Sequence, residues 1–153
     1  MSAIRRFTDR TGRQSEAYIA AESVSGANPA ANSEASITVP TGERWLLKSV
    51  SIALSQGATQ TPYPGLIIDD GTNTLFEAKS GTAAQAATTD SRHTWAPGLP
   101  LSQAGATPDI KCTGPLPSGL VLEAGYRIRT NTVGKGAATD WGIPWALVHK
   151  LPV

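Results

Sequence analysis

The feature that most constrains the fold is a two-residue alternation that runs through residues 115–153. Apolar or threonine side chains first alternate with arginine and asparagine: Tyr126, Ile128 and Thr130 against Arg127, Arg129 and Asn131. Large apolar side chains then recur at every second position, and we expect them to share one face: Trp141, Ile143, Trp145 and Leu147. Because successive side chains of a β-strand point to opposite faces, this period predicts strands with one buried face.

Shorter runs of the same kind extend back to residue 34 and are separated by glycine and proline turns. We expect strands at residues 36–39, 44–54, 66–69, 72–78, 92–96 and 109–112. Within 44–54, the pattern places Leu46, Val50, Ile52 and Leu54 on one face and Trp45 and Leu47 on the other. Short strands at roughly ten-residue spacing predict a sandwich or a barrel. With 153 residues in total, the prediction is one all-β domain, an antiparallel β-sandwich over residues 34–153.

Residues 1–33 are predicted to form an extended N-terminal arm. Residues 1–13 carry four arginines against one aspartate, a net charge of +3, whereas the rest of the chain has nine basic and eleven acidic groups, a net charge of −2. A terminus of this kind is either a frayed tail or an arm that orders on a neighbouring subunit. The apolar side chains within it favour the arm, whose candidate contact residues are Arg5, Arg6, Phe7, Arg10 and Arg13.

Composition narrows the class of partner and the compartment. Charged residues make up 16% of the chain, below the usual quarter, which favours a surface partly covered by a partner. The net charge of +1 gives no reason to expect nucleic acid or an acidic membrane. The sequence shows no secretory signal pattern and no apolar run of about 18 residues, so we expect folding in a cytoplasm and no membrane span. The single cysteine, Cys112, is expected to be a small half-buried side chain, since it cannot form an internal disulfide.

The residues that could carry catalysis do not form a recognisable constellation. Asp90, Ser91 and His93 are close in sequence, whereas a nucleophile, base and orienting group normally meet across a fold. A metal site built from His93, His149 and Cys112 would need all three to converge. We therefore expect no enzyme, no cofactor and no metal site.

Two acidic residues precede a glycine at residues 69–71, in the sequence Asp69-Asp70-Gly71, with Asn73 close by. Asp-Gly is a strong hairpin-turn signal, because glycine accepts a positive φ. A calcium loop would require further acidic ligands at fixed offsets, which are missing. The turn is the favoured interpretation.

The four tryptophans, Trp45, Trp95, Trp141 and Trp145, all lie in or beside predicted strands. Core packing is the first interpretation. Trp141 and Trp145 are also candidate subunit-interface aromatics, because the alternation places them on one face, and a sugar-stacking platform is a third interpretation.

Two stretches resemble small virion proteins of tailed bacteriophages. The first is Pro40-Thr41-Gly42-Glu43-Arg44-Trp45-Leu46-Leu47, followed by the Asp69-Asp70-Gly71 hairpin, and the second runs from Leu116-Pro117-Ser118-Gly119 through Gly125-Tyr126-Arg127-Ile128-Arg129 to Asp140-Trp141 and Pro144. The resemblance covers roughly residues 37–148, and within this group the chain is most similar to jelly-roll cement (decoration) proteins that clamp phage capsids as trimers.

The resemblance implies a jelly-roll sandwich that binds the outer surface of a phage capsid, stabilises the expanded lattice and is located in the virion after assembly in the host cytoplasm. The implied partners are the major capsid protein and further copies of the chain in a homotrimer, with no direct nucleic acid and no membrane. No fixed motif marks capsid contacts, so none is transferred to positions of this sequence. Two alternatives stay open: a tail or head–tail connector subunit, and a carbohydrate- or host-receptor-binding module.

Overall fold

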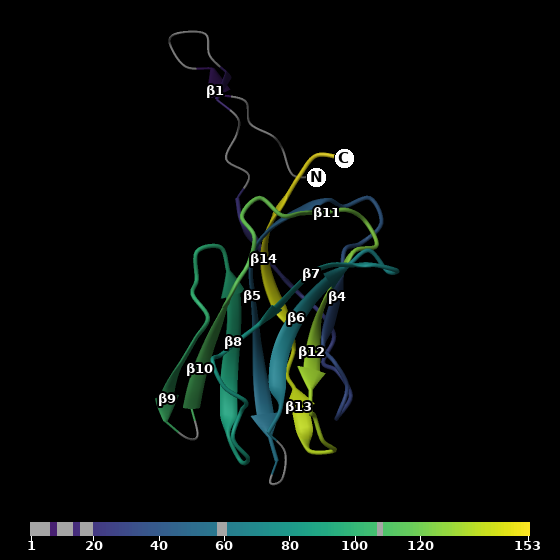
Figure 1. Ribbon diagram of the computed structural model, residues 1–153. Coiled ribbons are helices and arrows are strands. Elements are labelled where there is room, and N and C mark those ends of the chain that lie inside the picture. The colour runs from purple at the N-terminus through teal and green to yellow at the C-terminus, as the bar shows by residue number, and fades with distance from the viewer. Residues whose placement is uncertain (1–6, 9–13, 16–19, 58–60, 107–108) are drawn as a thin grey trace.

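The computed structural model describes residues 7–8, 14–15, 20–57, 61–106 and 109–153, and this part of the chain contains strands and no helix (Figure 1). In chain order the strands are β1 (Phe7–Thr8), β2 (Gln14–Ser15), β3 (Glu22–Ser25), β4 (Ser36–Thr38), β5 (Trp45–Gln56), β6 (Tyr63–Asp69), β7 (Thr74–Lys79), β8 (Asp90–Ala96), β9 (Ser102–Ala106), β10 (Asp109–Pro115), β11 (Val121–Leu122), β12 (Arg127–Val133), β13 (Thr139–Trp141) and β14 (Trp145–Lys150). Accordingly, no helix of the described residues is long and apolar enough to cross a membrane.

Two sheets pack face to face. The large sheet has the order β3-β14-β5-β8-β10-β9, with β11 and β13 also paired to β5, and the small sheet has the order β4-β12-β6-β7. Neighbouring strands in both sheets are antiparallel, except that β10 runs parallel to β8. The prediction of an all-β sandwich is confirmed, the expected antiparallel pairing holds apart from the β8–β10 pair, and jelly-roll connectivity stays a prediction.

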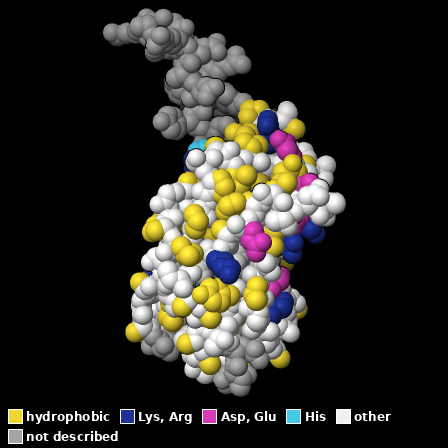
Figure 2. All heavy atoms as spheres, in the orientation of Figure 1, with side chains coloured by type: hydrophobic (Ala, Val, Ile, Leu, Met, Phe, Trp, Pro, Cys, Tyr) yellow, Lys and Arg dark blue, Asp and Glu magenta, His cyan; other side chains and the backbone are white. Residues whose placement is uncertain are grey.

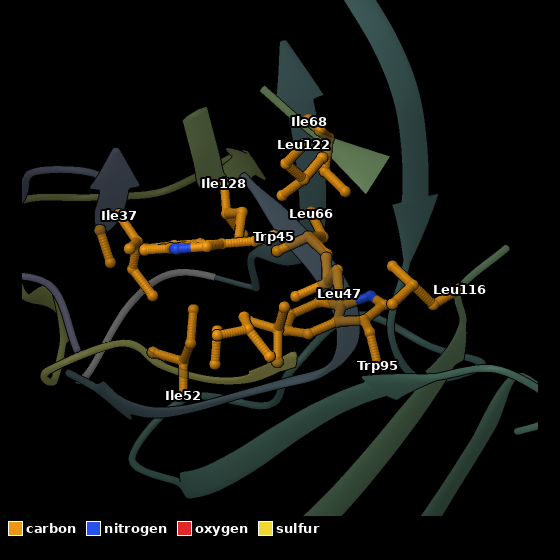
Figure 3. Packing of buried hydrophobic residues seen from close by; sticks show 14 of the residues in the cluster. Ile37, Trp45, Leu47, Ile52, Leu66, Ile68, Trp95, Leu116, Leu122 and Ile128 are labelled. Carbon is orange, nitrogen blue, oxygen red and sulfur yellow. The ribbon is translucent and has the colours of Figure 1, made fainter. Parts of the chain in front are cut away.

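The core fills the space between the sheets with side chains from every second position of the facing strands (Figure 3). The large sheet contributes Trp45, Leu47, Val50, Ile52, Leu54, Trp95, Trp141, Ala146 and Val148, and the small sheet contributes Ile37, Leu66, Ile68 and Ile128. Two-sided contact of this kind removes both inner faces from water, which is the main stabilising contribution available to a sandwich.

The side chains of the central strand β5 are distributed between its two faces differently from the prediction. Trp45 and Leu47 are buried in the same core as Val50, not on the opposite face, and Leu46 is only half-buried. The register against β14 jumps at this point, because Val148 pairs with Leu47 and Leu147 pairs with Ser49. Lys48 is therefore the extra residue of a β-bulge, and one extra residue resets a period of two.

The expected common face for Trp141 and Trp145 is wrong. Trp141 ends β13 and is 1% exposed, whereas Trp145 opens β14 and is 47% exposed. Both strands pair with β5, but Gly142, Ile143 and Pro144 form an interruption between them. Because this interruption does not continue the strand geometry, the buried positions of β14 are Ala146 and Val148.

Part of the predicted arm lies on the sandwich. Strand β3, within residues 1–33, pairs with β14 and forms an edge of the large sheet. Asn32 also donates its backbone N–H to the carbonyl oxygen of Thr139 at 3.2 Å. Nearer the N-terminus, β1 and β2 pair with each other as a small antiparallel sheet.

One glycine allows β10 of the large sheet to approach β7 of the small sheet closely. A Cβ atom on Gly114 of β10 would lie 2.4 Å from the Lys79 carbonyl oxygen and 2.6 Å from Cδ1 of Trp95. The same atom on Gly142 would meet only Ala53, at 3.6 Å. The close approach of β10 to β7 thus requires a residue without a side chain.

We predict that Gly114→Ala destabilises the fold by about 1–3 kcal/mol, because the new methyl group must displace backbone or a buried indole. The matched control is Gly142→Ala, which should change the free energy of unfolding by less than about 1 kcal/mol. Urea denaturation of both variants measures the difference, and equal stabilities would contradict the tight contact at Gly114.

Candidate interaction surfaces

An apolar stripe lies on the outer face of the large sheet, turned away from the core. It consists of Trp145 and Leu147 on β14, which are 47% and 41% exposed. Ile143, which lies just before the strand, is 42% exposed. These side chains are among the few large apolar ones that the described residues leave open to solvent. Exposed apolar groups that are contiguous mark interaction sites more often than scattered ones do.

Serine residues flank this stripe on both neighbouring strands. The register places Ser25 of β3 and Ser51 of β5 on either side of Trp145, and it places Ser23 and Ser49 on either side of Leu147. We call Trp145, Leu147 and these four serines the Trp145 surface. It carries no charge and few long side chains, so a partner could cover it without desolvating an ionised group.

One group of charged side chains lies on the small sheet. The charged side chains visible in Figure 2 gather mostly along the side of the molecule where the small sheet lies in Figure 1. There, Asp69 of β6 is 3% exposed and accepts hydrogen bonds from Arg127 Nε at 2.6 Å and Arg129 Nε at 2.5 Å. Although burial raises the pKa of Asp69, these hydrogen bonds outweigh it and hold the pKa below its usual value.

The neighbouring Asp70 confirms the turn interpretation of residues 69–73. One of its carboxylate oxygens accepts the backbone N–H groups of Thr72 at 2.8 Å and Asn73 at 2.6 Å. Gly71 adopts a φ of 95°, and the hairpin from β6 to β7 has a four-residue loop, Asp70–Asn73, instead of the two-residue turn that Asp-Gly favours. Both carboxylates are thus engaged by backbone and arginine groups, and the described residues contain no cluster of three or more metal-binding side chains.

A groove of about 510 Å³ lies between the edge strands β3 and β4. Its lining includes Val24, Ile37 and Trp45, with Glu43 and Lys150 also part of it. The two charged groups pair with each other, since Glu43 lies 3.2 Å from Lys150 Nζ. Glu43 also accepts a hydrogen bond from the Trp45 indole N–H at 2.6 Å. The hydrogen bond from Trp45 lowers the pKa of Glu43, so this carboxylate is an ion-pair partner and not a proton donor near neutral pH.

His93 is a core residue. Its Nδ1 lies 2.6 Å from Ser80 Oγ and its Nε2 lies 2.8 Å from Ser91 Oγ. The ring is fully buried and packs against Trp95 and Trp141, with ring centroids 6.0 and 5.4 Å away. Both nitrogens are occupied by serines, and no substrate can reach a group that is sealed in this way.

Of the other candidate catalytic or metal-binding residues, Cys112 lies beside His93, as its partner in the register of β10 and β8, whereas Asp90 and His149 do not join it. Asp90 is exposed at the start of β8, and the register places His149 opposite Leu46 of β5, whereas His93 lies opposite Ile52. Cys112 is buried, not half-buried as expected, and its sulfur accepts a hydrogen bond from Gln85 Nε2 at 3.2 Å. Burial raises the pKa of this thiol, which disfavours the reactive thiolate.

The candidate arm residues Arg5, Arg6, Arg10 and Arg13 lie outside the described residues, and Phe7 is described only as backbone of β1. Comparison of the chain with protein-family models, with curated proteins and with solved structures finds no match. The interpretation of function therefore depends on the surfaces of this chain.

Two features were missed from the sequence. The outward position of Trp145 follows from the interruption at residues 142–144, for which Gly142 and Pro144 were the available signal. Two arginines of β12 share the buried Asp69 of β6. To predict this interaction one must know that β6 pairs with β12, and no local sequence pattern gives that pairing.

Proposed function

We propose that this chain is a structural virion protein, a cement (decoration) protein of jelly-roll type that binds the major capsid protein on the outer surface of a phage head as a homotrimer. The observation that supports this proposal most directly is the Trp145 surface, an uncharged patch on the outer sheet face that leaves a tryptophan and a leucine in water. Interface centres are depleted in charge and enriched in aromatic side chains, and tryptophan is a frequent energetic anchor.

Two further arguments favour a structural role. The segments that resemble phage cement proteins correspond to strands and turns of the sandwich, including β5, the β6–β7 hairpin and β12. Two of the candidate reactive side chains, His93 and Cys112, are buried and engaged by hydrogen bonds.

A binder of this kind would act by mass action. If it occupies sites that are formed only in the expanded lattice, binding shifts the equilibrium toward that lattice. Many copies that bridge neighbouring capsomers would add avidity without a new type of contact. The role requires a stiff sandwich and a complementary surface, and it requires no active site.

The test is a co-sedimentation titration with expanded capsids of the parent phage. We predict that Trp145→Ser combined with Leu147→Ser weakens binding at least about tenfold, because central interface anchors typically contribute more than 1–2 kcal/mol. Light scattering of the same sample should give a mass of three times 15.9 kDa.

The matched control is Leu75→Ser on β7, an equally exposed leucine (48%) on the small sheet, which should bind as the unmodified chain does. Failure of the unmodified chain to bind expanded capsids would contradict the cement role. Binding that survives the double substitution would place the capsid contact on another surface.

A carbohydrate-binding role is the second candidate, because serine hydroxyls on both sides of an exposed indole could hydrogen-bond a sugar that stacks on the ring. A glycan array distinguishes the two functions: a signal that Trp145→Ala abolishes would favour the sugar, and capsid binding without such a signal would favour the cement role.

A further inference from the structure

Two arginines on the outer face of the small sheet share one buried carboxylate. Arg127 and Arg129 lie two positions apart on β12, and each donates its Nε–H to a different oxygen of Asp69. The aspartate side chain is 3% exposed, whereas the arginine side chains are 40% and 36% exposed. The carboxylate is thus covered by the two guanidinium groups, which themselves remain open to water.

Most of the donors of this pair are unused. A guanidinium group carries five N–H bonds, and Asp69 takes one from each arginine through Nε. Beyond these, Arg127 Nη2 makes one long contact of 3.5 Å to the Gly71 carbonyl oxygen, and the described residues provide no further hydrogen-bond partner for either Nη pair.

The pair also carries an excess of charge. Two positive groups and one negative group leave a net charge of +1. Elsewhere in the described domain, Arg44 and Lys135 each pair with one glutamate, and Lys150 pairs with two.

Asp69 also accepts the Gly71 N–H at 2.9 Å, so its position is fixed from the backbone and it holds both arginines in place. Preorganised guanidinium groups lose less side-chain entropy when they bind an oxyanion.

The surroundings select among oxyanions. Asp70 lies half-buried in the adjacent loop, and Glu77 of β7 lies in the same cross-strand row as Ile67 and Arg129. These negative groups would repel a phosphate dianion or a nucleic-acid backbone more strongly than the single charge of a carboxylate, whose two oxygens the remaining Nη–H donors can bind.

We propose that Arg127 and Arg129 form a preorganised site for one carboxylate side chain of a protein partner. The site lies on the small sheet, whereas the Trp145 surface lies on the large sheet. The contacts that support the site do not depend on the proposed capsid role.

The test is a titration of the full chain, followed by NMR of the arginine Nε–H groups, with a terminally blocked pentapeptide Gly-Ser-Glu-Ser-Gly at low ionic strength. We expect saturable shifts at Arg127 and Arg129 with a millimolar Kd. The same peptide with glutamine in place of glutamate should not saturate, and inorganic phosphate should bind more weakly than the glutamate peptide.

Arg127→Gln combined with Arg129→Gln should weaken binding about tenfold or more, because charge-assisted hydrogen bonds are lost. If this variant does not fold, Arg129→Lys replaces it. The lysine variant should weaken binding severalfold, because lysine keeps the positive charge but cannot donate two parallel N–H bonds to a carboxylate. The matched control is Arg92→Gln, an exposed arginine on the large sheet, which should leave binding unchanged.

Three results would overturn the proposal. They are the absence of saturation at Arg127 and Arg129, phosphate binding as tight as peptide binding, and an equal loss of affinity in Arg92→Gln, which would show attraction by overall charge alone.

Discussion

Replacing Trp141 with alanine should lower the free energy of unfolding by about 3–5 kcal/mol. The indole is 1% exposed, packs edge-on against His93 and donates its N–H to Thr132 Oγ1 at 2.9 Å. The substitution removes a large apolar group from a dense core and also removes the donor that Thr132 accepts from.

Trp145→Ala is the matched control for this prediction, since the two tryptophans are four positions apart and both lie in strands paired with β5. We expect it to change the free energy of unfolding by less than about 1 kcal/mol, because its side chain is already half in water. Urea denaturation followed by far-ultraviolet circular dichroism measures both variants without depending on tryptophan fluorescence. Comparable losses in the two variants would contradict the assignment of one tryptophan to the core and the other to the surface.

The second large effect is a loss of stability in mild acid that His93 causes. Burial lowers the pKa of His93 from 6.5 to about 4, since a charged imidazole would lose its water inside the core. The ring hydrogen-bonds to Ser80 and Ser91 and packs against two tryptophans, its neighbours in the sheet are Cys112 and Ile52, and none of these groups is a carboxylate that could compensate a positive charge.

The unfolded chain therefore binds a proton at this histidine below pH 6.5, and the folded chain does so only near pH 4. Between these values the unfolded state holds more protons, so the free energy of unfolding falls as the pH falls. At about 1.4 kcal/mol per pH unit the loss amounts to about 3 kcal/mol over this window.

Urea denaturation at several pH values between 7 and 4 measures this slope, and His93→Gln should abolish most of it, because glutamine does not titrate. The carboxylates of Asp69 and Glu34, whose pKa values are lowered, lose their stabilising hydrogen bonds only at lower pH, as the pH falls through their folded-state values. A slope that persists unchanged in the glutamine variant would show that another group titrates in this window.

The fold class was predictable because the alternation of side chains along a strand depends only on neighbouring residues and is the same for any order of the strands in the sheet. Ile128 and Thr130 are buried and Arg127 and Arg129 lie outward, as the alternation around them indicated. The bulge at Lys48 was not predictable, since its neighbours on both sides obey the same period and only the pairing with β14 reveals the extra residue.

The candidate surfaces were less accessible to sequence reasoning than the fold was. The alternation from Trp141 to Leu147 is regular in the sequence, yet the backbone leaves the strand geometry at Gly142 and Pro144, and Trp145 and Leu147 face outward as a result. Asp69 was expected to serve a turn, and it does bond to Gly71, but its main partners are 58 and 60 positions away. Such distant partners are a property of strand order, which no short pattern encodes.

The pairing of β3 with β14 has a consequence for synthesis of the chain on the ribosome. Residues 22–25 find their partners only when residues 145–148 have been made, and β5 also lacks its β14 neighbour until then. A nascent chain would thus expose the apolar side chains of β5 through most of translation, a period in which unpaired strands are prone to aggregation. Completion of the sandwich therefore joins two strands that are more than a hundred residues apart, β3 and β14, and its rate is governed by closure of a very long loop.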